Sequence, residues 1–73
     1  MDKIRQDGKV ILQSNDGVSI PVIFNNLIGR NFSGKEYSNY IRYIAVGSMG
    51  FSPGHIERCR DGEVINKGII PNV

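Results

Sequence analysis

The chain has 73 residues, with nine Lys and Arg, seven Asp and Glu, and a formal net charge of +2. A chain of this length forms one domain, residues 1–73, and folding buries only about 60% of its surface, so the core is small. Hydrophobic residues at 40% and charged residues at 22% are typical of globular domains and argue against disorder and fibrous structure. The charge is too small to make nucleic-acid binding the default interpretation.

Cys59 is the only cysteine, so the chain cannot form an intramolecular disulfide. Small secreted domains usually carry several disulfides, which favours a reducing setting for this chain. The first residues contain no apolar signal region, and no stretch approaches the length of a membrane span. We therefore expect a cytoplasmic protein with no membrane association.

Asp-Gly pairs at 7–8, 16–17 and 61–62 lie between apolar segments of the chain. Asp tolerates left-handed backbone and Gly adopts it freely, so such a pair predicts a tight hairpin turn. The third pair predicts a C-terminal hairpin of residues 55–60 and 63–67.

The first third of the chain is predicted to form antiparallel strands at 3–5, 9–13 and 18–24. Residues 18–24 alternate apolar and other side chains with a period of two, which is typical of a half-buried strand. Pro21 lacks an N–H group, so this strand needs one unpaired side. The side chains expected on the buried face are Val10, Leu12, Val18, Ile20, Val22 and Phe24.

Residues 33–36 predict the start of a helix. In a capping box the Ser33 hydroxyl accepts from the Glu36 amide, and the Glu36 carboxylate accepts from the Ser33 amide. Gly47 is expected to end the helix and residues 48–54 to form a loop. The expected buried face of the helix comprises Tyr37, Tyr40, Ile41 and Ile44.

Residues 39–46 are also rich in aromatic and β-branched side chains, which favour a strand. The helix is preferred because the capping box and the helical periodicity agree. We therefore predict a single α+β domain with an antiparallel β-meander or hairpin, one α-helix and then a β-hairpin. The alternative is a five-stranded small β-barrel in which residues 39–46 form a strand.

Residues 29–35 come close to a phosphate-binding P-loop, but the next residue is Glu36 where that motif needs Ser or Thr. A loop that enters a capped helix explains this segment better. His55, Glu57 and Cys59 alternate along one predicted strand and span about 13 Å, which is too far to bind one zinc ion.

His55 is the only histidine, and no G-x-S-x-G motif is present. The acidic residues are scattered over turns and caps rather than paired. We therefore expect no catalytic residues, no metal and no cofactor, and a protein that is not an enzyme.

The function that remains is a small stand-alone protein-binding module of the inhibitor or adaptor type. Chains of this kind are often accessory proteins of phages or mobile elements, although no residue here indicates that origin. Tyr and Arg are enriched in interaction hot spots, and Tyr43 lies at the edge of the apolar helix face. The residues expected to contact a partner are Arg30, Lys35, Arg42, Tyr43, Met49 and Phe51.

The alternative function is nucleic-acid binding through Arg30, Lys35 and Arg42, with Tyr43 stacking on a base. A homodimer formed through an unpaired strand edge is compatible with either function.

Overall fold

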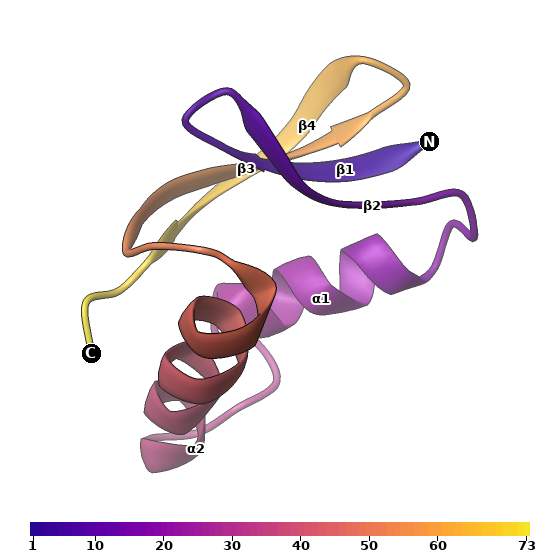
Figure 1. The fold of residues 1–73 in the computed structure, drawn as a ribbon. Helices are drawn as coiled ribbons and strands as arrows, with labels where there is room; N and C mark the ends of the chain where they lie inside the picture. The colour runs from indigo at the N-terminus through magenta and orange to yellow at the C-terminus, as the bar shows by residue number, and fades with distance from the viewer.

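Four antiparallel strands form an open sheet in the order β2-β1-β3-β4, and two helices pack on one of its faces (Figure 1). This computed structural model describes all residues 1–73. The elements are β1 (Asp2–Gln6), β2 (Lys9–Ser14), α1 (Ser19–Leu27), α2 (Lys35–Asn39), η1 (Tyr40–Met49), β3 (Gly54–Arg60) and β4 (Glu63–Ile70). The predicted α+β class is confirmed. The alternative barrel is wrong, because β2 and β4 remain as open edges of the sheet.

Two of the three Asp-Gly pairs form the predicted hairpin turns. Asp7-Gly8 joins β1 to β2, with φ of 54° and 77°, and Asp61-Gly62 joins β3 to β4, with φ of 51° and 84°. Positive φ at both central residues is the geometry that matches the twist of two antiparallel strands. The short N-terminal strand and the C-terminal hairpin are therefore confirmed.

The third pair, Asp16-Gly17, starts a helix instead, so the strand predicted at 18–24 is wrong. The Asp16 carboxylate accepts hydrogen bonds from the backbone N–H groups of Val18 (2.9 Å) and Ser19 (2.8 Å), and also from the Ser19 hydroxyl. The first backbone N–H groups of a helix have no carbonyl partner within the helix. By accepting hydrogen bonds from two of them, the Asp16 carboxylate stabilises the start of α1. Pro21 is compatible with α1 because it lies in the first turn of the helix. Backbone N–H groups there have no carbonyl partner within the helix, so the missing N–H of proline breaks no hydrogen bond.

The helix also changes which apolar side chains are buried. Ile20, Phe24 and Leu27 are spaced by four and three residues and are fully buried. Val18 and Val22, which were expected to be buried, are 64% and 50% exposed. Of the other two side chains expected on the buried face of a hairpin, Leu12 is half-buried and Val10 is exposed.

The second helix is confirmed, although its details differ from the prediction. Five α-helical residues of α2 continue directly into ten π-helical residues of η1. The helix ends at Met49 and is followed by Gly50, whose φ is 96°, so Gly47 lies inside it. The predicted capping box is not formed, because the Glu36 amide donates to the Ser33 carbonyl oxygen (3.2 Å) rather than to its hydroxyl.

The buried stripe of this second helix repeats every four residues. Ile41 and Ala45 are fully buried, and Tyr37 and Met49 are half-buried and pack against the core. This spacing follows from the wider turn of a π-helix, whose hydrogen bonds join residues five apart. Ile44 was expected on the buried face but is 40% exposed.

The core lies between the sheet and the two helices. Gly68 of β4 allows α1 to approach the sheet closely, since a Cβ atom there would lie 2.5 Å from Cγ2 of Ile28. The buried cluster comprises Ile4, Ile20, Phe24, Leu27, Ile41, Ala45, Phe51, Ile56 and Ile70.

Gln6 ties the loop before β3 to the sheet. Its buried side-chain amide donates from Nε2 to the Ser52 carbonyl oxygen (2.6 Å) and accepts at Oε1 from the Ser52 backbone N–H (2.8 Å). Both ends of one amide therefore bind the same peptide unit of the loop, next to buried Phe51.

Replacing Gln6 with Ala should lower the free energy of unfolding by about 2 kcal/mol, because two hydrogen bonds of a buried amide are lost together. Urea denaturation followed by circular dichroism measures this difference. Gln13→Ala is the matched control, since Gln13 is an exposed glutamine of the edge strand β2. Equal stability of Gln6→Ala and Gln13→Ala would show that the loop does not depend on this contact.

Candidate functional site

Tyr43 is the most exposed aromatic side chain and lies on the solvent side of η1. Its exposed fraction is 61%, and the guanidinium carbon of Arg42 lies 6.0 Å from the centroid of its ring. Ile41 and Ala45, each two residues away, are fully buried. Two residues correspond to about half a helical turn, so Tyr43 points directly away from the core.

Two further apolar side chains of η1 are exposed within three residues of Tyr43. Ile44 and Val46 are each 40% exposed, and neither was among the predicted partner contacts. The signal available in the sequence was the spacing of Tyr43 and Val46 on the predicted α-helix, where residues three apart are neighbours; the wider π-helical turn of η1 moves them apart. We call Arg42, Tyr43, Ile44 and Val46 the Tyr43 surface.

Phe51 does not belong to any exposed surface. It is 2% exposed and forms part of the core cluster, so its predicted availability to a partner is wrong. The reason is the short loop after Gly50, which Gln6 holds against the sheet through Ser52. Met49 is half-buried and packs against the same core, which leaves it little free surface.

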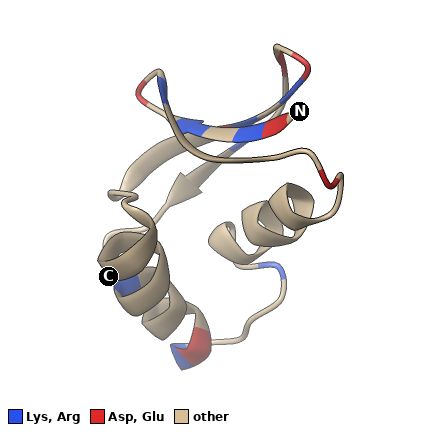
Figure 2. Ribbon diagram, turned by 45° about the vertical axis from the view of Figure 1, so that its right-hand side comes forward, with Lys and Arg blue, Asp and Glu red and all other residues tan.

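The three predicted basic contacts are exposed but lie apart along the helical layer. Arg30 follows α1, Lys35 starts α2, and Arg42 lies in η1 (Figure 2). Arg42 lies seven positions after Lys35, which corresponds to about 10 Å along a helix. With Glu36, these residues carry the whole net charge of +2, because the remainder of the chain holds six basic and six acidic residues.

An aromatic contact positions the helix that carries the Tyr43 surface. The ring of Phe32 lies 4.9 Å from that of Tyr40 and 6.4 Å from that of Tyr37, measured between centroids. The Tyr37 hydroxyl donates to the Leu27 carbonyl oxygen at the end of α1 (2.5 Å). Burial raises the pKa of both tyrosines. Tyr37 therefore links the second helix to α1 through its hydroxyl group. Tyr37 and Tyr40 both pack against the core, as predicted.

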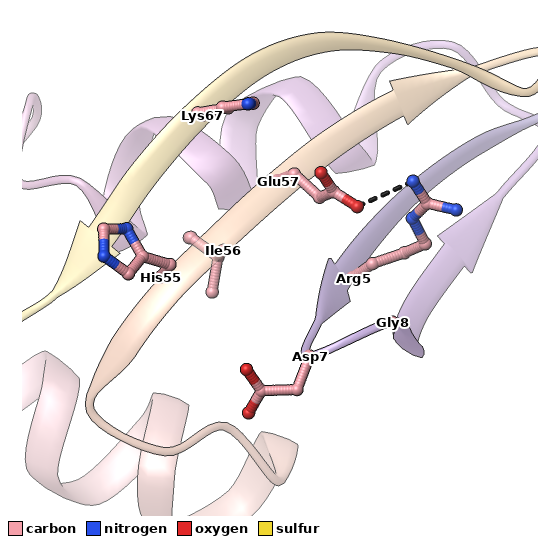
Figure 3. A pocket seen from close by; sticks show the side chains of 7 residues that line it. All are labelled: Arg5, Asp7, Gly8, His55, Ile56, Glu57 and Lys67. Atoms are coloured by element: carbon pink, nitrogen blue, oxygen red, sulfur yellow. Dashed lines mark ion pairs between the residues drawn. The ribbon is translucent and has the colours of Figure 1, made fainter.

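A shallow pocket of about 290 Å³ lies at the turn between β1 and β2 (Figure 3). His55 and Asp7 stand on opposite sides of it, and an ion pair between Arg5 and Glu57 (2.6 Å) joins β1 to β3 above Asp7 in this view. The lining residues are Arg5, Asp7, Gly8, His55, Ile56, Glu57 and Lys67. Opposite charges in this pocket neutralise each other, so it has no clear preference for an anion or a cation.

The strand register places His55, Glu57 and Cys59 on the outer face, opposite the helices. They pair with Ile69, Lys67 and Val64 of β4, whereas Ile56 between them faces the core. Cys59 is nevertheless buried. No group of three His, Cys, Asp or Glu side chains in residues 1–73 is placed to hold a metal ion.

Ion pairs connect the N-terminal strand to the far hairpin. The buried Asp2 carboxylate accepts from Nε (2.8 Å) and NH2 (3.2 Å) of Arg60, and the N-terminal ammonium lies 2.7 Å from Asp61. The hydrogen bonds and charge of Arg60 hold the pKa of Asp2 below its ordinary value.

The lowered pKa of Asp2 predicts a loss of stability in acid. A carboxyl group whose pKa is lower in the folded state stabilises the fold above about pH 4, and this contribution disappears as the pH falls further. The unfolding midpoint of Asp2→Asn should lie below that of the wild type at pH 7, and the two should converge in acid. Thermal unfolding between pH 7 and pH 2 measures this convergence.

Asp7→Asn provides the control for this experiment, because Asp7 is exposed and forms no ion pair. It should retain the wild-type dependence on pH. A constant difference between wild type and Asp2→Asn over the whole range would contradict the role given to the ion pair with Arg60.

The chain belongs to a family described as a domain of unknown function, DUF7688, whose model matches residues 1–71. Neither a curated protein nor a solved structure matches the chain. Neither helix has the length and apolar character needed to cross a membrane.

Proposed function

We propose that this chain is a protein-binding module of the inhibitor or adaptor type, which contacts its partner through the Tyr43 surface. The observation that supports this function is the exposure of Tyr43, Ile44 and Val46 together on one short stretch of η1. Arg42 adds a cationic side chain beside the Tyr43 ring. Tyr and Arg are the residue types that most often dominate the binding energy of an interface.

The rigidity of the supporting helix favours the same proposal. Ile41 and Ala45 anchor η1 in the core, and Tyr37 fastens the preceding turn to α1 through its hydroxyl group. A surface that is already held in place loses little conformational entropy on binding.

Replacing both Arg42 and Tyr43 with Ala should weaken partner binding at least ten-fold while the free energy of unfolding changes by less than about 0.5 kcal/mol, because both side chains are exposed. Affinity capture from a lysate of the native source, with quantitative mass spectrometry, compares the variant with the wild type. Val22→Ala is the control, since Val22 is an exposed apolar residue of α1. Equal retention of partners by wild type and the double variant would contradict the proposal.

Nucleic-acid binding is the second candidate, because the net positive charge of the chain lies in the helical layer at Arg30, Lys35 and Arg42. Three phosphate contacts with duplex DNA would give a slope of about −2.7 for the logarithm of the binding constant against the logarithm of salt concentration, and about −2.1 with a single strand. Fluorescence anisotropy with labelled duplex and single-stranded DNA and RNA measures this slope. Binding that is absent, or independent of salt, would exclude this candidate, as would captured proteins that remain after nuclease treatment.

A further inference from the structure

The outer edge of β4 is the more accessible of the two edges of the sheet. β4 has eight residues and β2 has six, and three of the six residues of β2 are half-buried. Residues 63–67 and Ile69 are all exposed. An edge strand carries backbone N–H and C=O groups that have no strand partner on one side, so it can pair with another extended chain.

One row of charges crosses the outer face of the sheet and ends at this edge. The register aligns Arg5 of β1, Glu57 of β3 and Lys67 of β4 as cross-strand neighbours. Glu57 turns toward Arg5, with 2.6 Å between their charged atoms, and away from Lys67 (Figure 3). Lys67 takes part in none of the ion pairs of the chain. The row therefore alternates in charge and ends on an unpaired ammonium.

Apolar side chains flank Lys67 on the same face of β4. Ile69 is 58% exposed and Val64 is 37% exposed, and both belong to the outer face through their pairing with His55 and Cys59. A strand added beside β4 would place one side chain opposite Lys67 and another opposite Ile69. A complementary strand therefore has an acidic residue opposite Lys67 and an apolar residue opposite Ile69.

We propose that the β4 edge binds an extended segment of another protein, which adds a fifth antiparallel strand with an acidic side chain opposite Lys67 and an apolar one opposite Ile69. Backbone hydrogen bonds supply the affinity and the acidic side chain fixes the register. This surface shares no residue with the Tyr43 surface and lies in the other layer, so it goes beyond the function proposed above.

A second copy of this chain fits the edge less well. Glu63 is the only acidic residue of β4, and it pairs with Arg60 on the opposite face of the sheet from Lys67. Two β4 strands paired edge to edge would therefore offer Lys67 no carboxylate on its own face. A two-fold axis through this residue would even place two ammonium groups opposite each other, which is destabilising.

Two blocked peptides test the proposal, with the sequences Thr-Val-Thr-Glu-Thr-Val-Thr and Thr-Val-Thr-Lys-Thr-Val-Thr. Each is titrated into the full ¹⁵N-labelled chain and followed by the NMR shifts of the backbone amides. We expect the shifts to concentrate in β4 and the Glu peptide to bind about five-fold more tightly than the Lys peptide. Lys67→Glu should reverse this preference, and Tyr43→Ala should leave it unchanged, which separates this site from the Tyr43 surface.

Lys9→Glu is the matched control, since Lys9 is an exposed lysine of the other edge strand, and it should keep the wild-type preference. The proposal is overturned by shifts that lie outside β4, by the absence of binding, or by a preference that Lys67→Glu does not change. It is also overturned if the β4 amides shift with protein concentration alone while sedimentation shows a dimer, because the occupant would then be a second copy.

Discussion

The contact between Gln6 and Ser52 is the constraint on which the arrangement of the two layers depends. The chain leaves the sheet after β2, forms both helices, and must return as β3 in the middle of the sheet, between β1 and β4. One buried amide binds both the N–H and the C=O group of Ser52 and so fixes where the chain re-enters. This contact lies next to Phe51, which is part of the buried core.

The two proposed surfaces lie in different layers and rest on different physical features. The Tyr43 surface combines apolar and aromatic side chains with the cationic Arg42, and its helix is anchored by Ile41 and Ala45. The β4 edge offers backbone groups without a strand partner, although the Lys67 N–H donates to Asn66 Oδ1 (2.9 Å). It also offers one ammonium outside any ion pair, because Arg5 has taken the carboxylate beside Lys67.

The fold was predicted wrongly where one pattern of apolar residues is compatible with both a strand and a helix. Residues 18–24 alternate like a strand, yet Ile20, Phe24 and Leu27 also form one face of a helix. The carboxylate of Asp16 decides between them by accepting hydrogen bonds from two amides at the helix start. For the candidate site, the exposure of Tyr43 could be predicted from its place on the helical wheel. The burial of Phe51 could not, since it depends on Gln6, 45 residues earlier in the chain.

The sequence by itself determined the features that depend on neighbouring residues. Asp7-Gly8 and Asp61-Gly62 form hairpin turns because both residue types accept positive φ, and the α+β class follows from these hairpins and the second helix. Only the tertiary structure decided which side chains meet across the sheet. Arg5, Glu57 and Lys67 form one row because strands distant in the sequence pair in a particular register, and no local pattern encodes that register.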